Sequence, residues 1–251
     1  MNKFFNFIKK KQKQLDDDLA GNPYNFRQST QIYSLTRKLF PLFNKYISGT
    51  VVDAGAGKKA YKEVVESITN DYIAIDIKKT SETRMPDILC DMQDISIKSE
   101  TIDTVLCVQA LQHAYEPFRV IKEFYRILKP GGILILSAPH LVYMHDIPHD
   151  FYRFTDYGLK YLAEKAGFTV LETYRVGGLL SLICHIPSTL MIILFQKPVI
   201  LKNIVRTINY YFVKSVVRIE TLFDPDRIYA KNIIIVARKS NNSGVKYEKE
   251  E

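Results

Sequence analysis

Short apolar runs alternate with polar stretches along most of the chain. Runs of this length that are rich in Val, Ile and Leu are typical of strands buried within a sheet. Segments with helical spacing lie between several of them, so the alternation predicts an α/β fold with helices on both faces of a mainly parallel sheet. Seven strands are expected, at residues 51–54, 71–76, 87–90, 102–108, 132–138, 168–176 and 232–239.

Helical spacing is clearest ahead of the first strand, over residues 22–48. Pro41 and Gly49 interrupt this pattern, and we interpret residues 1–48 as a helical cap. Residues 1–13 mix phenylalanine with lysine, which fits either a basic helix on an anionic membrane surface or a solvated end. The apolar positions that share one face of the predicted helix are Ile32, Leu35, Leu39 and Leu42.

A long insertion, residues 178–230, separates the last two predicted strands. It opens on an apolar run that approaches the length needed to cross a bilayer. A single crossing is excluded if residues 232–239 rejoin the same sheet, and His185 and Pro187 weaken a lipid-facing span. Three interpretations stay open: a helical lid over a hydrophobic acceptor, a dimer surface, or a contact with lipid headgroups. The last would use Lys202, Arg206, Lys214 and Arg218.

Composition adds hints about partners and compartment. The formal net charge of +8 suits phosphates, anionic lipids or nucleic acid, although many proteins without such partners carry a similar charge. Cys90, Cys107 and Cys184 lie in apolar runs without CxxC spacing, so neither a disulfide framework nor a zinc site is supported. We expect one domain at residues 49–240, a disordered polar tail at residues 241–251, and a reducing cytoplasm.

The chemistry of the chain begins at VVDAGAGKKAY, from Val51. Gly55 and Gly57 permit a sharp turn that lets a ligand approach the backbone. The same letters satisfy a dinucleotide fingerprint, with Asp76 placed to hold a ribose diol as in NAD enzymes. However, Asp53 lies two residues before Gly55, where a carboxylate disfavours a pyrophosphate and favours a cofactor with an amine and a sulfonium.

Five segments together resemble the class I S-adenosylmethionine-dependent methyltransferases, particularly the type 11 subgroup. The resemblance covers roughly Thr50 to Gly178 and implies a Rossmann-like seven-stranded sheet whose last strand is antiparallel. NIIIVARK, from Asn232, can supply that strand. The segments are VVDAGAG, YIAIDI, ILCDMQDI, IDTVLCVQALQH and IKEFYRILKPGGILILSAP.

The resemblance also implies S-adenosylmethionine as cofactor and assigns residues to it. The Gly55 and Gly57 loop would pass under its methionine part, and Asp76, with Ile77 beside it, would accept both ribose hydroxyls. The adenine would lie between Asp91 and Met92, and the backbone of Gln109 would meet the methionine end. One residue departs from the pattern: Lys59 stands where a third glycine is usual, so either its side chain points to solvent or the loop is altered.

The segment that follows the fifth predicted strand carries the substrate clues. Its PHDFYRFT run resembles the PHDYYRFT run of a methyltransferase subset that often accompanies polysaccharide biosynthesis, with Phe151 in place of the first tyrosine. Such a density of polar and aromatic groups at the ligand edge of the sheet predicts an acceptor site. The candidate substrate contacts are His140, His145, Asp150, Tyr152 and Arg153.

Methyl transfer to a hydroxyl needs a general base, and histidine suits that role. His149 is the first candidate, with Asp150 near enough in sequence to orient it, and His113 is the second. The alternative is structural: His149 and Asp150 cap the helix that begins near Thr155, and Arg153 makes an internal pair. No spacing supports a metal site, and none is expected.

The sequence therefore predicts a cytoplasmic S-adenosylmethionine-dependent methyltransferase, either free or peripheral at the inner face of the membrane. O-methylation of a small or lipid-linked acceptor, such as a sugar hydroxyl, is the favoured reaction. VQAL at the exit of the fourth strand differs from the NPPY-type run used on base amines, so no nucleic-acid substrate is expected. A homodimer, a non-catalytic methyltransferase-like scaffold and an NAD-dependent oxidoreductase stay open as alternatives.

Overall fold

The computed structural model describes residues 28–78, 85–195 and 198–241. The segment at residues 1–13, for which a membrane-surface helix and a solvated end are both open, and almost all of the expected tail lie outside these ranges. By packing, the chain divides into two compact units. Of the described residues, the sheet unit comprises those at 42–174 and 233–241, and the helical unit comprises those at 28–41 and 175–232.

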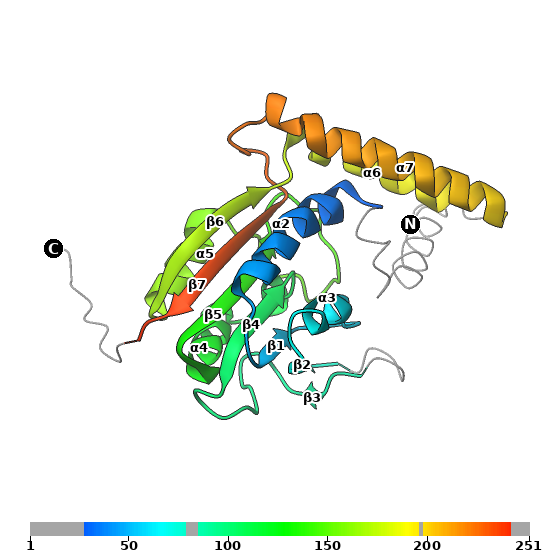
Figure 1. The fold of residues 1–251 in the computed structure, drawn as a ribbon. Helices are drawn as coiled ribbons and strands as arrows, with labels where there is room; N and C mark the ends of the chain where they lie inside the picture. Colours follow the sequence, from blue (N-terminus) through cyan, green and yellow to red (C-terminus); the bar gives the residue numbers. More distant parts are fainter. Residues whose placement is uncertain (1–27, 79–84, 196–197, 242–251) are drawn as a thin grey trace. The chain divides into compact units, whose positions relative to one another are not determined.

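A seven-stranded sheet with the order β3-β2-β1-β4-β5-β7-β6 forms the core of the sheet unit (Figure 1). Neighbouring pairs from β3 to β5 are parallel. The last strand runs antiparallel between β5 and β6, which confirms the predicted fold class. The strands are β1 (Val51–Ala54), β2 (Tyr72–Asp76), β3 (Ile88–Leu89), β4 (Ile102–Val108), β5 (Leu128–Pro139), β6 (Phe168–Val176) and β7 (Asn232–Lys239).

Helices cover both faces of this sheet, with α4 and α5 on one face and α3 on the other (Figure 1). α4 (Pro117–Ile127) begins with proline, whose fixed φ suits a first helical turn, and buries Val120, Ile121 and Phe124 at helical spacing. α5 (Asp156–Lys165) begins where predicted, because the Thr155 hydroxyl caps the Gly158 amide at 3.0 Å. The remaining elements here are α3 (Lys62–Glu66) and the 3-10 turn η2 (Leu111–His113).

Three predicted boundaries differ in the structure. β3 keeps only Ile88–Leu89 of its four expected residues. The helix predicted over residues 22–48 is α2 (Thr30–Tyr46), and it continues through Pro41 instead of being interrupted there. β5 begins at Leu128, ahead of the predicted start at residue 132, and a shift in register against β4 marks a bulge in its first part. Gly131 takes a φ of 79° there, a backbone conformation that favours glycine.

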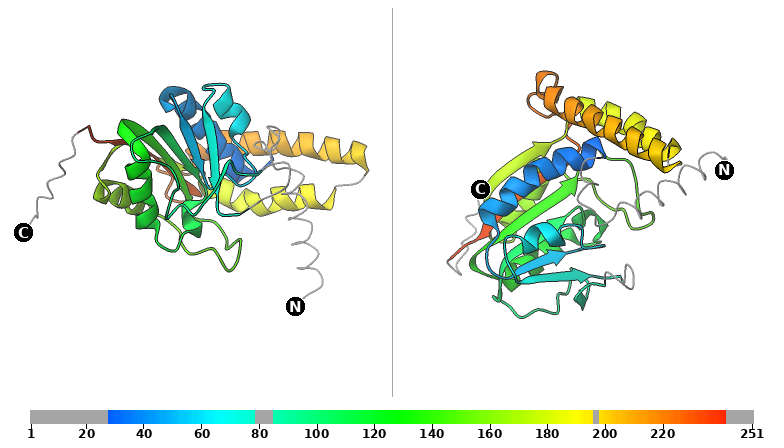
Figure 2. Two further views of the ribbon diagram at one scale, coloured as in Figure 1. Left: turned by 90° about the horizontal axis from the view of Figure 1, so that it is seen from below. Right: turned by 45° about the vertical axis from the view of Figure 1, so that its right-hand side comes forward.

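The helical unit is built on a hairpin of two helices, α6 (Leu179–Leu194) and α7 (Val199–Ile219). They run side by side in all the views of Figures 1 and 2. A 3-10 turn, η3 (Glu220–Leu222), follows α7. Of the described helices, none is long and apolar enough to span a membrane.

Two buried carboxylates hold the start of α6. Glu220 accepts hydrogen bonds from the amide and hydroxyl of Ser181 at 2.7 and 3.0 Å, and it pairs with Arg227 at 2.7 Å. Asp224 accepts from the Leu179 amide at 3.3 Å. Negative charge at a helix N-terminus satisfies free amides and complements the helix dipole. The base of the hairpin is therefore polar and tightly bonded.

The histidine in α6 makes the stability of this unit sensitive to acid. Burial, with the nearby charge of Lys231, lowers the pKa of His185 from 6.5 to about 4. The unfolded chain binds a proton in this range that the folded chain does not, so stability falls as the pH drops below the unfolded value. We expect the free energy of unfolding to fall by up to about 2 kcal/mol between roughly pH 7 and pH 5. Urea unfolding followed by circular dichroism measures it.

The variant His185→Gln keeps a polar side chain but cannot titrate, so it is the matched control. Its loss of stability over the same range should be smaller than that of the parent. Equal losses in the two proteins would show that other groups carry the acid sensitivity.

Candidate functional site

A cavity of about 610 Å³ opens at the carboxyl ends of β1, β2 and β4. Ligand sites of α/β sheets lie at this edge, and this volume is in the usual range for a cofactor-sized ligand. Its lining comprises Gly55, Gly57, Asp76, Ile77, Lys78, Asp91, Met92, Gln93, Gln109, Ala110, His113, Ala114, Tyr115, Asp146, Ile147 and His149.

The glycine turn forms one wall of the cavity, and both glycines have positive φ values, 71° for Gly55 and 52° for Gly57. A Cβ added at Gly55 would lie 2.4 Å from the Cβ of Ala110, closer than two carbons can approach. A Cβ added at Gly57 would meet no atom within 4 Å. Because Gly55 has no side chain, the turn after β1 can approach the residues that follow β4. Gly57 leaves its backbone uncovered beside the cavity.

Asp76 ends β2 and holds this turn. Its Oδ2 accepts the Gly57 amide at 2.9 Å, and its Oδ1 accepts the Lys78 amide at 3.0 Å. Each carboxylate oxygen has a second lone pair, so the group can still accept hydrogen bonds from a diol. The carboxylate is thus fixed in position before any ligand binds.

The opposite wall comes from the segments after β3 and β4. Asp91 accepts hydrogen bonds from the backbone and the side chain of Gln93, at 2.8 and 3.1 Å, and Met92 offers an apolar surface beside it. Gln109 has a φ of 56°, which is unusual for a residue with a side chain, and its amide bonds to the Ser137 carbonyl at 2.8 Å. A strained residue at a strand exit is often part of a binding site.

Asp53 lies apart from the cavity lining. It is buried at the end of β1, where the Tyr72 hydroxyl donates to it at 2.6 Å. Burial raises the pKa of Asp53 to about 6, although the bond from Tyr72 opposes the rise. The carboxylate is therefore not in the cavity wall, and its charge varies with pH near neutrality.

Lys59, which stands where the family pattern usually has a glycine, is accommodated by its backbone conformation and by an ion pair. Lys59 has a φ of 53°, the conformation that a glycine would adopt easily. Its Nζ bonds to Asp87 at 2.7 Å, and only 11% of its side chain is exposed. The lysine neither points into solvent nor contributes to the cavity lining, so the glycine loop keeps its form.

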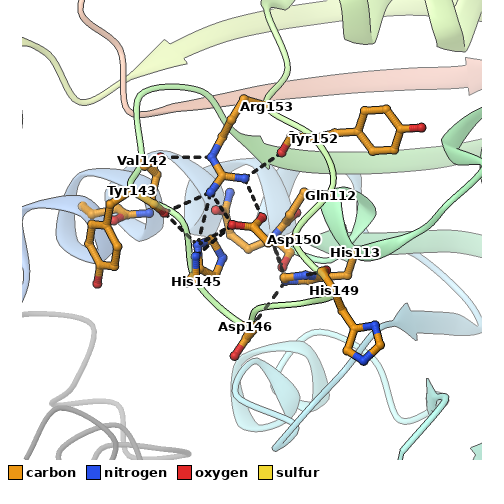
Figure 3. Close-up of polar contacts among 12 residues, drawn as sticks. Gln112, His113, Val142, Tyr143, His145, Asp146, His149, Asp150, Tyr152 and Arg153 are labelled. Carbon is orange, nitrogen blue, oxygen red and sulfur yellow. Dashed lines mark hydrogen bonds and ion pairs between the residues drawn. The ribbon is translucent and has the colours of Figure 1, made fainter. Parts of the chain in front are cut away.

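The loop after β5 is held by a clamp between two charged side chains (Figure 3). Arg153 makes two bonds of 2.6 Å to the carboxylate of Asp150. It also donates to the carbonyls of Val142 and Tyr143, at 3.0 and 2.9 Å. The Arg153 guanidinium is the main reason that the pKa of Asp150 lies well below its usual range. This pair organises the loop itself, as the structural alternative anticipated for Arg153.

The two candidate bases meet at the mouth of the cavity. His113, in η2, has its Nδ1 2.7 Å from the His149 carbonyl, so Nδ1 is the protonated nitrogen of the neutral ring. Its Nε2 lies 3.1 Å from Nε2 of the Gln112 side chain. The His149 ring has no hydrogen-bond partner among the described residues, and it points away from the Arg153 clamp (Figure 3). Neither His149 nor Asp150 caps α5.

Three side chains place one ligand atom each within 4.8 Å of one another: His113, His145 and Asp146. The guanidinium of Arg153 lies 3.5 Å from Nδ1 of His145. A fixed positive charge at this distance disfavours a bound cation. The expectation of no metal stays a prediction.

The cavity thus gathers most of the predicted cofactor residues and both candidate bases. The predicted substrate contacts His140, His145, Asp150, Tyr152 and Arg153 lie outside its lining, as does Asp53. Sequence reasoning missed Tyr115, Asp146 and Ile147. The sequence could have indicated them only by their position, because each lies within three residues of His113 or His149.

Comparison with known proteins agrees with this geometry. Residues 52–136 match the family model of a methyltransferase domain. The chain is similar to S-adenosylmethionine-dependent methyltransferases. A probable enzyme of that name from Mycolicibacterium smegmatis is 22% identical over 63% of this chain and 64% of its own length. Another from Mycobacterium tuberculosis is 23% identical over 50% of this chain and 46% of its own length.

Solved structures support the fold. An S-adenosylmethionine-dependent methyltransferase from Archaeoglobus fulgidus superimposes with a TM-score of 0.53 and 16% identity, over 85% of this chain and 96% of the other. The [4+2]-cyclase SpnF gives 0.57 and 17%, over 82% of each chain. This chain spans between about half and two thirds of the mycobacterial relatives. The cavity, with its bare glycine turn and strand-end carboxylates, fits the cofactor that those relatives are named for.

Replacing the Asp76 carboxylate tests the cavity as that cofactor site. Asp76→Asn keeps one oxygen for the backbone but removes the charge, and a hydrogen bond to a charged group contributes about 1.5–3 kcal/mol. We expect the dissociation constant for S-adenosylhomocysteine, measured by calorimetry, to rise by roughly 10- to 100-fold. Asp94→Asn, at an exposed acid outside the lining, is the control and should leave affinity unchanged. Unaltered affinity in Asp76→Asn would remove Asp76 from the site.

Proposed function

We propose that this protein is an S-adenosylmethionine-dependent methyltransferase that acts on a hydroxyl group. The observation that carries the proposal is the shared cavity: the residues suited to the cofactor and the ring of His149 line the same space. A base beside a cofactor site is what O-methylation requires, because a hydroxyl is a weak nucleophile until its proton is removed.

Different residues of the cavity would bind different parts of the cofactor. Asp76 would hold the ribose, Asp91 and Met92 would border the adenine, and the backbone at Gly57 and Gln109 would face the methionine end. When bound, S-adenosylmethionine supplies a methyl group on a positively charged sulfur. Most of the rate in such a transfer comes from alignment, which fixed carboxylates and strained backbone provide.

His149 would receive the proton of the acceptor hydroxyl at a ring nitrogen. Its ring meets Phe151 edge to face, but its nitrogens have no hydrogen-bond partner among the described residues, so a nitrogen lone pair is available. His113 serves a different role, because its Nδ1 donates to the His149 carbonyl and so fixes the backbone that carries the base. We therefore assign His149 as the catalytic base and His113 as a positioning residue.

The acceptor is proposed to be small or lipid-linked, with a sugar hydroxyl as the favoured target. Two features of the cavity mouth support this class: Tyr115 offers an exposed aromatic face, and Asp146 offers an exposed carboxylate. An aromatic ring packs against the apolar face of a sugar, and a carboxylate accepts its hydroxyl protons. The PHDFYRFT run, with its resemblance to methyltransferases of polysaccharide biosynthesis, points the same way, and a cytoplasmic location fits it.

Cofactor choice is the direct test of the proposal. Calorimetry with the full chain should show binding of S-adenosylmethionine and S-adenosylhomocysteine, and no binding of NAD, because the buried Asp53 carboxylate, two residues before Gly55, disfavours a pyrophosphate. Binding of NAD alone would replace this proposal by an oxidoreductase.

Replacing each histidine in turn distinguishes the proposed catalytic base, His149, from the positioning residue, His113. His149→Gln should retain cofactor affinity and lower kcat by about 100-fold or more, the usual contribution of a general base. His113→Asn, which can still donate one hydrogen bond, should lose much less. Turnover is followed as S-adenosylhomocysteine released from a panel of sugar acceptors. Full kcat in His149→Gln would remove that residue from the mechanism.

A further inference from the structure

The hairpin helix α7 has two apolar faces, and only one of them is covered. Residues of an α-helix advance by about 100° each, so buried Val205, Val213 and Val216 share one side with buried Asn209. On the other side is a stripe that spans roughly 100° of arc. We call it the α7 stripe; it comprises Ile200, Ile204, Ile208, Tyr211 and Ile219, all exposed.

Such a stripe is not what a water-facing helix carries. A surface helix places polar residues opposite its buried face, because exposed apolar side chains gain nothing there. Exposed apolar residues that are scattered singly are ordinary, but these five share one face of one helix, with Ser215 among them. The α7 stripe therefore has the pattern of a contact face.

Charge identifies the class of partner. No acidic residue occurs between Gly177 and Ile219, whereas lysine and arginine occur at positions 197, 202, 206, 214 and 218. Lys214 and Arg218 are exposed at one edge of the α7 stripe. Of the carboxylates that follow the helix, Glu220 and Asp224 are buried and bonded within the unit, whereas Asp226, beyond η3, is exposed. The exposed face of α7 itself thus combines apolar side chains with positive charge and carries no acidic residue.

An anionic lipid surface matches that combination. An interfacial helix lies with its apolar stripe at the boundary of the acyl chains, while lysine and arginine reach the headgroups. A second copy of this chain matches less well, because a two-fold contact would bring the same positive charges together. The hairpin also leaves β6 and returns to the neighbouring β7, so both of its ends lie on one side, as a contact with one leaflet requires.

We propose that the α7 stripe binds the surface of an anionic membrane and so holds the protein at the bilayer. A lipid-linked acceptor would be met at that surface. Lipid binding itself needs neither cofactor nor transfer, so its test is independent of the proposed reaction.

Vesicle flotation of the full chain tests the contact. The protein should float with vesicles that contain phosphatidylglycerol, less with pure phosphatidylcholine, and less at high salt. The variant Ile204→Glu with Ile208→Glu should lower the partition coefficient by at least about tenfold, because two apolar anchors become charged.

The matched control lies on α5, where Tyr157 and Tyr161 are also exposed and four residues apart. Their exposed fractions, 74% and 60%, are comparable with the 52% and 56% of Ile204 and Ile208. Tyr157→Glu with Tyr161→Glu therefore changes net charge and exposed apolar surface similarly, yet should float like the parent. Circular dichroism and cofactor affinity check that both variants are folded.

Fluorescence gives a second readout, because the chain contains no tryptophan. Ile208→Trp should shift its emission to shorter wavelength on addition of anionic vesicles, and brominated lipids should quench it. Tyr157→Trp should do neither. Equal flotation of the parent and the α7 variant overturns the proposal. So does a variant that loses self-association on sedimentation while its flotation is unchanged, since the stripe would then bind a second copy.

Discussion

The cavity depends on how closely the ends of β1 and β4 approach each other. At Gly55 there is no room for a single methyl group, because the side chain of Ala110 occupies the space. This contact brings the turn after β1 beside the Gln109–Ala110 corner, so backbone from two strands faces one space. Any larger residue at position 55 would separate the two exits and widen the site.

Around that contact, the polar groups of the site are fixed by the chain itself. Asp76 is held by two backbone amides and Asp91 by Gln93, before any ligand is present. The loop that carries His149 is braced by the pair of Asp150 and Arg153. Pre-organisation of this kind lowers the entropy lost on binding and leaves the side chains aligned for reaction.

The sequence predicted the sheet well because its strands are β-branched, buried and separated by clear breaks. It placed Gly55, Gly57, Asp76 and Asp91 at or just after strand ends, and all four line one cavity because strand ends gather at one edge of the sheet. It could not predict how the loop after β5 uses its charges. Arg153 reaches carbonyls ten and eleven residues earlier in the chain, and such contacts leave no periodic pattern. For the same reason the sequence did not show that Asp150 and Arg153, predicted as substrate contacts, pair with each other, or that the Lys59 side chain bonds to Asp87.

The connection between β6 and β7 fixes how far apart the two ends of the helical insertion lie. Where the helical insertion leaves and returns, the Lys231 amide bonds to the Val176 carbonyl at 2.9 Å, and the two strands are neighbours in the sheet. The distance that the inserted chain must close is therefore that of a tight hairpin, whatever its length. Lengthening or shortening such a loop costs little closure entropy. The insertion can therefore differ in length at little cost, and none of its residues belongs to the cavity lining.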